Sequence, residues 1–303
     1  MIEEEKVMVS VCIVTYKHEA YIKEAIEGVL NQEVDFKVNL LIGDDCSPDN
    51  TSAIVEEMMA NHPNGHWITY IKRKENIGMM PNFIDLLERC SGKYIALCDG
   101  DDYWTDPLKL QQQVDFLENN SEYVISFHKS VNYDLKHLKN ERVFYGDLKS
   151  DKTVDQKWLA AGIYIPTATS CFKNNFTLPD NFNKVKNADT FLWSILGHQG
   201  KAIFQHDINP SVRRVHQGGV FSMKDDVYRF QQMLHSYKQM LSVTDDRYKT
   251  YLKTKICKTY IMLSKAYLKK YNLGKSIPNF LQSLSFLQLN QYGLKSFLKV
   301  LIS

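Results

Sequence analysis

The first hundred residues alternate between two patterns of apolar and polar positions. Continuous apolar runs predict strands, most of them buried on both faces, at residues 9–15, 38–42, 67–72 and 93–98. Apolar residues at helical spacing predict helices at residues 19–31, 51–60 and 80–90. Strands that alternate with helices over short connections predict an α/β fold with a mostly parallel sheet covered on both faces.

The pattern is less regular after residue 111. It predicts a helix at 111–119, strands at 123–127, 201–205 and 212–217, and a helix at 189–196 that begins near Asn187. Residues 132–152 are polar and are expected to be irregular. From Asp225 onward the pattern is almost wholly helical, with a helix stop at 272–274, a new helix opened by Pro278, and continuations at 281–286 and 297–302. We therefore expect an α/β domain at residues 1–224 and a mainly helical region at 225–303.

Polar clusters follow each of the first four predicted strands. These clusters are Thr15-Tyr16, Asp44-Asp45, residues 73–78 and residues 99–102. Ligands of open α/β sheets bind beyond the carboxyl ends of the strands. The clusters are therefore expected to form one binding site.

The stretch LCDGDDYW places Asp99, Asp101 and Asp102 within four residues. Like charges this close raise one another's pKa unless a cation or hydrogen-bond donors compensate. Clustered carboxylates are hard oxygen ligands that suit Mg²⁺ or Mn²⁺, and Mg²⁺ is usually held by one or two carboxylates together with substrate phosphates. The alternative is a solvated turn, because Asp and Gly both favour turns.

The segment GDDCSPDNT follows the second predicted strand. Asp45 is placed to accept a hydrogen bond from a nucleobase N–H or a ribose hydroxyl, while Ser47 or Asp49 is a candidate cap for the helix that begins near Thr51. Thr15 and Tyr16 offer a backbone contact and a ring face for a base. A lone aromatic residue after a strand is more often a packing residue.

Composition and charge narrow the class of protein. With 44% hydrophobic and 24% charged residues among 303, the chain is expected to be globular, and the six scattered cysteines lack CxxC pairs, which indicates reduced thiols in a cytoplasmic protein. The N-terminal sequence lacks the apolar region of a secretory signal. Thirteen of the residues from Val227 onward are Lys or Arg and two are Asp, a balance of +11, so the rest of the chain has a balance of −9. Such asymmetry indicates two regions with different partners.

Four blocks of the sequence resemble the family 2 glycosyltransferases in order and spacing. The blocks are VSVCIVTYKHEAYIKEAIEGVLNQ, LLIGDDCSPDNT, RKENIGMMPNF and GKYIALCDGDDYWTDPLKLQ, and the resemblance covers roughly residues 7–220. It implies the GT-A fold of the nucleotide-diphospho-sugar transferases, a Rossmann-like sheet flanked by helices, here with a C-terminal helical extension. It also implies a nucleotide-diphospho-sugar donor, with a UDP-sugar favoured, and Mn²⁺ or Mg²⁺ as cofactor.

The resemblance assigns roles to individual residues of the donor site. Tyr16 matches the base-contacting position, and Asp45 matches the carboxylate that reads the base. Asp99 matches the acid near the ribose, Asp101 the metal ligand that bridges to the diphosphate, and Asp102 the neighbouring acid that holds the loop and approaches the sugar. Asn76 and Gly78 match the NxG turn before the donor-site helix. Val14 and Lys17 replace the usual proline and asparagine of the first block, which leaves base recognition less defined.

An acceptor hydroxyl needs a base near neutral pH. The family places an acid at the start of a helix, and NADTFLW at 187–193 makes Asp189 the candidate, although Ala188 replaces the usual glutamate. The alternative is that Asp189 only favours the positive end of its helix, which predicts a loss of about 1 kcal/mol or less on its removal. No second carboxylate is evident as a covalent nucleophile, so a single displacement with inversion is expected.

The segment RRVHQGGVFS resembles the late RxHxGG segment of many relatives. There His216 is expected to complete the metal's coordination or to meet the diphosphate, with a structural hydrogen bond as the alternative. Arg213 or Arg214 could offset the charge of the diphosphate as it leaves.

The basic C-terminal region allows two interpretations. An aromatic-rich basic amphipathic helix is typical of membrane-surface binding, which a lipid-linked acceptor at the inner face of the cell membrane would make sensible. The alternative is a helical subdomain packed on the catalytic body or on a second copy of the chain, with solvated lysines. The region has no recognised nucleic-acid module, so nucleic-acid binding is not expected.

The sequence therefore predicts an inverting, metal-dependent glycosyltransferase that builds a surface polysaccharide or a lipid-linked oligosaccharide on a glycan or lipid-linked acceptor. A nucleotidyltransferase is an alternative, but it would normally need a Gly-rich loop after the first strand, and TYKHEAYIKE has no glycine. A second alternative, suggested by Ala188 and Val14, is a sugar-nucleotide-binding scaffold without catalytic activity.

Overall fold

The computed structural model describes residues 6–216, 218 and 224–287. Within these residues the chain forms two compact units that interleave along the sequence. The first contains residues 6–154, 165–176 and 201–216, and the second contains residues 155–164, 177–200 and the described residues after 217. The predicted division into functional domains at residues 224 and 225 stays a prediction.

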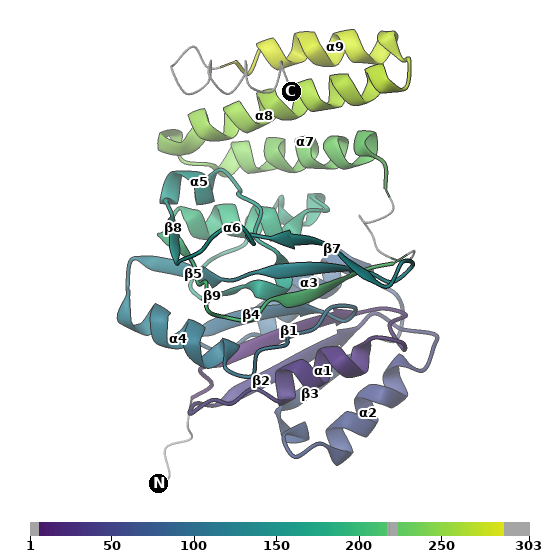
Figure 1. The fold of residues 1–303 in the computed structure, drawn as a ribbon, viewed down its shortest axis with the longest axis vertical. Helices are drawn as coiled ribbons and strands as arrows, with labels where there is room; N and C mark the ends of the chain where they lie inside the picture. The colour runs from purple at the N-terminus through teal and green to yellow at the C-terminus, as the bar shows by residue number, and fades with distance from the viewer. Residues whose placement is uncertain (1–5, 217, 219–223, 288–303) are drawn as a thin grey trace. The chain divides into compact units, whose positions relative to one another are not determined.

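An eight-stranded sheet forms the centre of the first unit (Figure 1). Its order is β3 (Ile68–Lys72), β2 (Val38–Asp44), β1 (Val9–Thr15), β4 (Tyr94–Asp99), β9 (Cys171–Lys173), β5 (Tyr123–Phe127), β10 (Lys201–Phe204) and β8 (Lys152–Val154). The first four strands run parallel, as do β5 and β10, while β9 and β8 are antiparallel to their neighbours. The sheet is therefore mostly parallel, and the predicted α/β class is confirmed.

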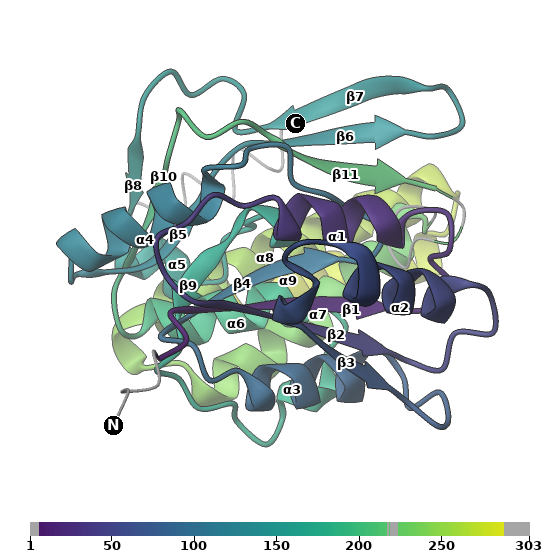
Figure 2. The same cartoon turned by 90° about the horizontal axis from the view of Figure 1, so that it is seen from below.

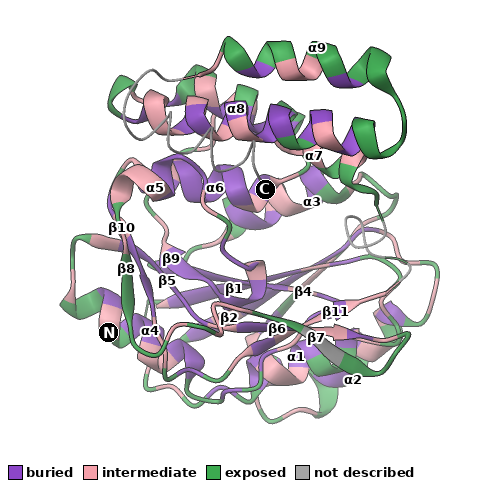
Figure 3. Ribbon diagram, turned by 45° about the horizontal axis from the view of Figure 1, so that its top comes forward, coloured by how far each residue is buried: buried purple, intermediate pink, exposed green. Residues whose placement is uncertain are grey.

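Helices cover both faces of the parallel half of this sheet. Figure 2 shows α1 (Ile22–Leu30) and α2 (Thr51–Asn61) on one face and α3 (Met79–Arg89) on the other. Helix α4 (Lys109–Asn119) contributes Leu110, Val114 and Leu117 to the same core as α1. The central strands are buried along nearly their whole length (Figure 3). Burial on both faces is the reason for their continuous apolar runs.

A second sheet of three strands overturns the expectation of an irregular segment at 132–152. Its order is β11 (Ser211–Val215), β6 (Ser130–Asp134) and β7 (Lys139–Phe144). Strands β6 and β7 form an antiparallel pair, and β11 joins β6 in parallel. Val143 on β7 is 47% exposed. A strand this open to solvent has no continuous apolar run, so its pairing is not visible in the hydrophobic pattern.

The second unit is built from helices. They are α5 (Gln156–Ala160), α6 (Ala188–Gly197), α7 (Asp226–Val243), α8 (Asp246–Lys269) and α9 (Leu273–Leu284). Helices α7, α8 and α9 pack one against the next (Figure 1). Among the described residues, no helix has the length and apolar character needed to cross a membrane.

The predicted boundaries in the tail need one correction. Residues 272–274 do not end a helix but begin α9, because the Asn272 side chain caps it by accepting a hydrogen bond from the Lys275 backbone N–H. Pro278 therefore lies inside α9 instead of opening it. Asparagine suits both ends of a helix, so the sequence alone does not distinguish a stop from a start. The predicted continuation at 297–302 and Gln217 of the predicted strand lie outside the described residues.

Candidate active site

The carboxyl ends of four parallel strands meet at one edge of the large sheet. Thr15 pairs with Asp44 across β1 and β2, Asp44 pairs with Lys72 across β2 and β3, and Val14 pairs with Asp99 across β1 and β4. The polar clusters that follow these strands therefore lie side by side. This confirms the convergence that the sequence predicts.

The acidic loop after β4 contains Asp99, Asp101 and Asp102. Each offers a carboxylate oxygen, and these oxygens lie within 4.8 Å of one another. Asp102 is buried, whereas Asp99 and Asp101 are partly exposed. The arrangement is a set of hard oxygen donors, which fits a divalent ion such as Mg²⁺ or Mn²⁺.

Residues from β11 and its continuation hold the acidic loop. The Arg214 backbone N–H donates to Asp102 Oδ1 at 3.0 Å, and the Arg214 guanidinium donates to the Asp101 carbonyl oxygen at 2.8 Å. His216 donates from Nε2 to Asp101 Oδ2 at 2.9 Å. Segments more than 110 residues apart in the chain are thus joined at the predicted metal site.

The two acids respond differently to this environment. Burial raises the pKa of Asp102 well above its ordinary value, and the negative charges of Asp101 and Asp99 raise it further. Burial also acts to raise the pKa of Asp101, but the hydrogen bond from His216 and the positive charge of His18 outweigh it and leave that pKa below its ordinary value. The neighbouring imidazoles therefore keep Asp101 ionised, as a metal ligand requires.

Arg214 itself is buried, and its side chain is already engaged within the first unit. It forms an ion pair with Glu24 of α1, and its guanidinium lies 4.4 Å from the centre of the Tyr103 ring. These contacts support a role for Arg214 in fixing the acidic loop. Arg213, the preceding residue, points to the other face of β11 because side chains alternate along a strand, and its charge lowers the pKa of Asp102. Contact of either arginine with a diphosphate stays a prediction.

Asp45 joins the end of β2 to the turn before α3. Its two carboxylate oxygens accept the backbone N–H groups of Ile77 at 2.7 Å and Gly78 at 2.9 Å. The Asn76 side chain donates to the Asp45 carbonyl oxygen at 3.1 Å. Gly78 has a φ of 92°, which a residue with a side chain rarely adopts. Hydrogen bonds therefore connect three predicted donor-site residues: Asp45, Asn76 and Gly78.

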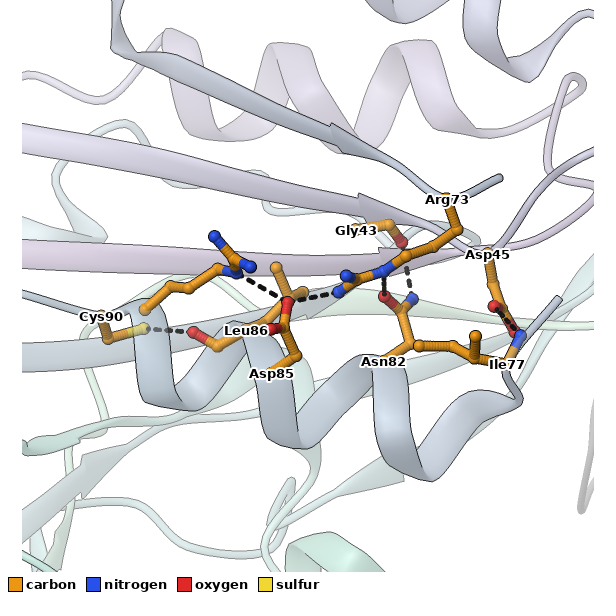
Figure 4. A network of polar contacts seen from close by, with 9 residues as sticks. Gly43, Asp45, Arg73, Ile77, Asn82, Asp85, Leu86 and Cys90 are labelled. Carbon is orange, nitrogen blue, oxygen red and sulfur yellow. Dashed lines mark hydrogen bonds and ion pairs between the residues drawn. The ribbon is translucent and has the colours of Figure 1, made fainter. Parts of the chain in front are cut away.

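The base of this turn is fixed by a polar network that sequence reasoning missed (Figure 4). Arg73 donates from Nε to Asn82 Oδ1 at 3.2 Å and forms an ion pair with Asp85. Asn82, which is buried, donates to the Gly43 carbonyl oxygen at 2.8 Å. A Cβ atom at Gly43 would lie 2.7 Å from Asn82 Oδ1, so β2 and α3 can approach this closely only with glycine there.

The loop after β1 is tied to the loop after β2 through its backbone. The Lys17 N–H donates to Ser47 Oγ at 3.0 Å, and the His18 N–H donates to Thr51 Oγ1 at 3.0 Å. Asp49 accepts from the Thr51 N–H at 3.2 Å at the start of α2, which agrees with the capping alternative for that residue. The segment GDDCSPDNT therefore contains at least one acid with a structural role, and the binding role of Asp45 stays a prediction.

Thr15 and Tyr16 differ in exposure. Thr15 is buried, whereas the Tyr16 side chain is 38% exposed and lies 5.1 Å from the Lys17 amine. Packing in the core does not account for an exposed ring. Its assignment to a nucleobase stays a prediction.

His18 belongs to the site, although sequence reasoning did not select it. Its Nδ1 lies 3.2 Å from Thr15 Oγ1, and its ring centre lies 6.5 Å from that of His216. Burial lowers the pKa of His18, and the charge of Asp101 partly offsets this effect. A Cβ atom at Gly100 would lie 2.7 Å from His18 Nδ1, so the acidic loop and the loop after β1 are in close contact. The sequence offers one indication that His18 belongs to the site: it lies three residues after Thr15, the end of a strand that is followed by other candidate site residues.

Asp189 belongs to the second unit, in the first turn of α6. Its Oδ1 accepts the Thr190 N–H at 2.6 Å, an interaction that agrees with a role at the positive end of the helix. Its charge helps to raise the pKa of the buried Tyr237 of α7, after burial itself. The base role of Asp189 stays a prediction.

Comparison with known proteins assigns the family. The model of glycosyl transferase family 2 matches residues 10–176, more than half of the chain, so this protein belongs to that family. An uncharacterized protein of Mycobacterium tuberculosis is 44% identical over 119 residues, which are 39% of this chain and 34% of that protein. A putative teichuronic acid biosynthesis glycosyltransferase of Bacillus subtilis, TuaG, is 31% identical over 116 residues, which are 38% of this chain and 44% of that protein. The matched part thus spans less than half the length of these relatives.

Solved structures confirm the GT-A type of fold. The complex of Staphylococcus aureus TarS with UDP-GlcNAc superposes with a TM-score of 0.65 at 15% identity, covering 97% of this chain and 89% of that chain. The mannosyltransferase PcManGT of Pyrobaculum calidifontis, in complex with GDP-Man and Mn²⁺, superposes with a TM-score of 0.60 at 18% identity, covering 98% and 85%. At these identities the likeness shows the fold alone.

Proposed function

We propose that this protein transfers a sugar, with inversion, from a nucleotide-diphospho-sugar to a hydroxyl group of a glycan or lipid-linked acceptor. The observation that carries the proposal is the acidic loop after β4, where Asp101 is hydrogen-bonded to His216 and lies beside Asp99 and Asp102. Family membership favours glycosyl transfer over the alternative of nucleotidyl transfer. The relative named for teichuronic acid biosynthesis supports a place in the synthesis of a surface polysaccharide.

The donor set of the acidic loop fits a hard divalent ion. Asp101 and His216 would hold Mn²⁺ or Mg²⁺, and Asp102 would keep the loop in place through the Arg214 backbone. When bound, the ion supplies Lewis-acid stabilisation of the negative charge on the departing nucleoside diphosphate. The Mn²⁺ in the complex of the mannosyltransferase PcManGT supports the choice of metal.

The remaining residues at the sheet edge would hold the nucleoside. The exposed Tyr16 ring offers a face for the base. Asp45 fixes the turn at Asn76–Gly78 and would accept a further hydrogen bond from the base, and Asp99 would lie near the ribose. A UDP-sugar is the favoured donor, and the UDP-GlcNAc complex of TarS supports this choice.

Asp189 would act as the general base of the reaction. It takes the proton of the acceptor hydroxyl as that oxygen attacks the anomeric carbon of the donor sugar. The bond from this carbon to the diphosphate oxygen breaks as the new glycosidic bond forms, which inverts the configuration of the carbon. Arg213 would offset the charge that develops on the diphosphate.

The proposal is tested with a panel of UDP-, GDP- and dTDP-sugars in the presence of Mn²⁺, followed by thermal stabilisation and by release of nucleoside diphosphate. One of these donors should stabilise the wild-type protein and be hydrolysed slowly without acceptor. Asp101→Ala should lose the stabilisation and lower the rate about 1,000-fold or more, whereas Asp207→Ala, at an exposed acid, should behave as wild type. Stabilisation without hydrolysis or transfer would favour the inactive scaffold, and the absence of any response across the panel would contradict the proposal.

A further inference from the structure

Helix α9 exposes most of its large apolar side chains, while Phe280 is partly buried. Its buried residues are Ser276 and Ser283, and the Ser264 hydroxyl of α8 donates to the Ser276 carbonyl oxygen at 2.9 Å. Four large apolar residues of α9 are exposed: Leu273 (60%), Ile277 (55%), Leu281 (58%) and Leu284 (43%). Small polar side chains therefore lie at the buried side of α9, and its leucine and isoleucine side chains are in contact with solvent.

The four exposed residues form one stripe, called the α9 stripe below. They follow a spacing of four, four and three positions, which places them within an arc of about 80° on a helix with 3.6 residues per turn. Tyr271, two residues before the stripe, is 96% exposed. Apolar side chains gathered on one exposed face mark an interaction surface more often than side chains scattered singly. In Figure 3, α9 is green over much of its length, the colour of exposed residues.

The surrounding charge indicates the kind of partner. No residue from Arg247 to the end of the sequence is Asp or Glu, and nine of the residues at 247–287 are Lys or Arg. Lys269, Lys270 and Lys275 flank the start of α9 and are exposed. Lys270 forms an ion pair with Asp225, whereas no acid lies in the segment that contains Lys269, Lys275 and the stripe. An apolar stripe flanked by an excess of lysines matches the interface of a bilayer that contains anionic lipids.

The same charge argues against a second copy of this chain as the occupant. Self-association through the α9 stripe would bring two sets of lysines together without carboxylates from the same segment to pair with them. An anionic lipid surface has the opposite effect, because each lysine near it contributes on the order of fivefold to binding.

We propose that the α9 stripe and the lysines at 269–275 form a docking surface for an anionic membrane. The leucine and isoleucine side chains insert at the level of the headgroups, and the lysines pair with lipid phosphates. The surface does not depend on the proposed glycosyl transfer, so it can be tested without substrate.

The test is flotation of the full chain with phosphatidylglycerol-containing vesicles and with pure phosphatidylcholine vesicles. The wild-type protein should bind the anionic vesicles, bind the neutral ones at least tenfold more weakly, and lose affinity as salt is raised. Leu273→Ser/Ile277→Ser/Leu281→Ser should weaken binding about 100-fold or more, since three apolar side chains no longer leave water. Lys269→Gln/Lys275→Gln should weaken it about 25-fold.

A matched control removes three exposed apolar side chains of the first unit, in Met59→Ser/Leu108→Ser/Leu138→Ser, and should bind as wild type. All substituted positions are exposed, and circular dichroism confirms that the variants fold. The proposal is overturned if the wild-type chain does not bind anionic vesicles or if the stripe variant binds as well as wild type. It is also overturned if light scattering shows a dimer that the stripe substitutions dissociate while vesicle binding is absent.

Discussion

The acidic loop after β4 and the segment from Arg247 to the end of α9 each gather charge of one sign, but they balance it differently. In the acidic loop, Asp101 and Asp102 accept hydrogen bonds from His216 and Arg214, which reach the loop from elsewhere in the same unit. The nine Lys or Arg residues at 247–287 have no acid within that segment, and three of them pair instead with acids that precede it: Arg247 with Asp245, Lys249 with Asp246 and Lys270 with Asp225. Acids that are held in place by hydrogen bonds are suited to bind a small ion, whereas an excess of lysines with few acids among them is suited to an extended anionic surface.

The largest expected effect is a loss of turnover on substitution of Asp189, which belongs to the second unit. Asp189→Asn removes the proposed base while keeping the size of the side chain, so kcat should fall about 1,000-fold. Donor binding, measured by calorimetry, should stay within twofold of wild type. The matched control is Asp180→Asn, at an exposed acid of the same unit. Full turnover by Asp189→Asn would show that the carboxylate serves only the helix end.

Lys109 differs from both regions, because its amine is buried and its hydrogen-bond partner is an amide oxygen and not a carboxylate. Its amine donates to Gln113 Oε1 at 2.8 Å and lies 3.9 Å from the centre of the Trp104 ring. Burial lowers the pKa of Lys109 to about 8. Between pH 8 and about 10.4 the unfolded chain therefore binds one more proton than the folded chain, so the free energy of unfolding rises with pH over this range. The gain in stability is complete above pH 10.4 and is lost as the pH falls through 8.

Replacing this lysine should remove that pH dependence. Between pH 7.5 and 10.4 the wild-type free energy of unfolding should rise relative to Lys109→Met by an amount on the order of 3 kcal/mol. Urea unfolding at several pH values measures the difference. Lys23→Met, at an exposed lysine, should run parallel to wild type. Equal slopes for wild type and Lys109→Met would refute the buried-charge interpretation.

Adding one methyl group at Gly100 tests whether the close contact between the acidic loop and His18 positions the donor site. Gly100→Ala would place a Cβ atom 2.7 Å from His18 Nδ1 and 2.8 Å from Thr15 Oγ1, so the loop must shift. Donor affinity should fall about tenfold, or 1.4 kcal/mol. Gly274→Ala is the control in α9, because its nearest neighbour would lie 3.9 Å away. Unchanged affinity in Gly100→Ala would mean that the contact does not position the site.

The smallest expected effect is a loss of stability on substitution of Asp49, an acid at the same sheet edge for which we expect a structural role only. Asp49 accepts hydrogen bonds from the Thr51 N–H, the Thr51 hydroxyl and the Glu19 N–H. Asp49→Ala should lower the free energy of unfolding by about 1 kcal/mol and leave donor affinity within twofold of wild type. Glu57→Ala on α2 is the control for stability. A tenfold loss of donor affinity in Asp49→Ala would place this acid in the binding site.

The sequence predicts the sheet edge well because parallel strands align their ends. Buried strands leave continuous apolar runs, so the positions of Asp45 and of Asp99 to Asp102 follow from the pattern alone. The hydrogen bond between Asp102 and Arg214 does not, since it joins residues 112 positions apart through strands of two different sheets. Side-chain contacts at such separations depend on packing that periodicity does not record.

The errors have the same origin. Strand β7 is exposed and polar, so its pairing with β6 leaves no alternating apolar signal. Helix α9 begins at an asparagine that a sequence pattern cannot distinguish from a helix end, and its fully buried residues are serines, whereas four of its large apolar residues are exposed. His18 is a single residue in a loop, and only its neighbours in space connect it with the site.

The most direct measurement of the central claim is binding of Mn²⁺, followed by electron paramagnetic resonance in the presence of UDP. The acids after β4 should hold the ion together with the diphosphate, so wild-type protein should take up Mn²⁺ when UDP is added and Asp101→Ala should not. Equal uptake by both proteins, or uptake by neither, would contradict the assignment of this loop to a metal–diphosphate site.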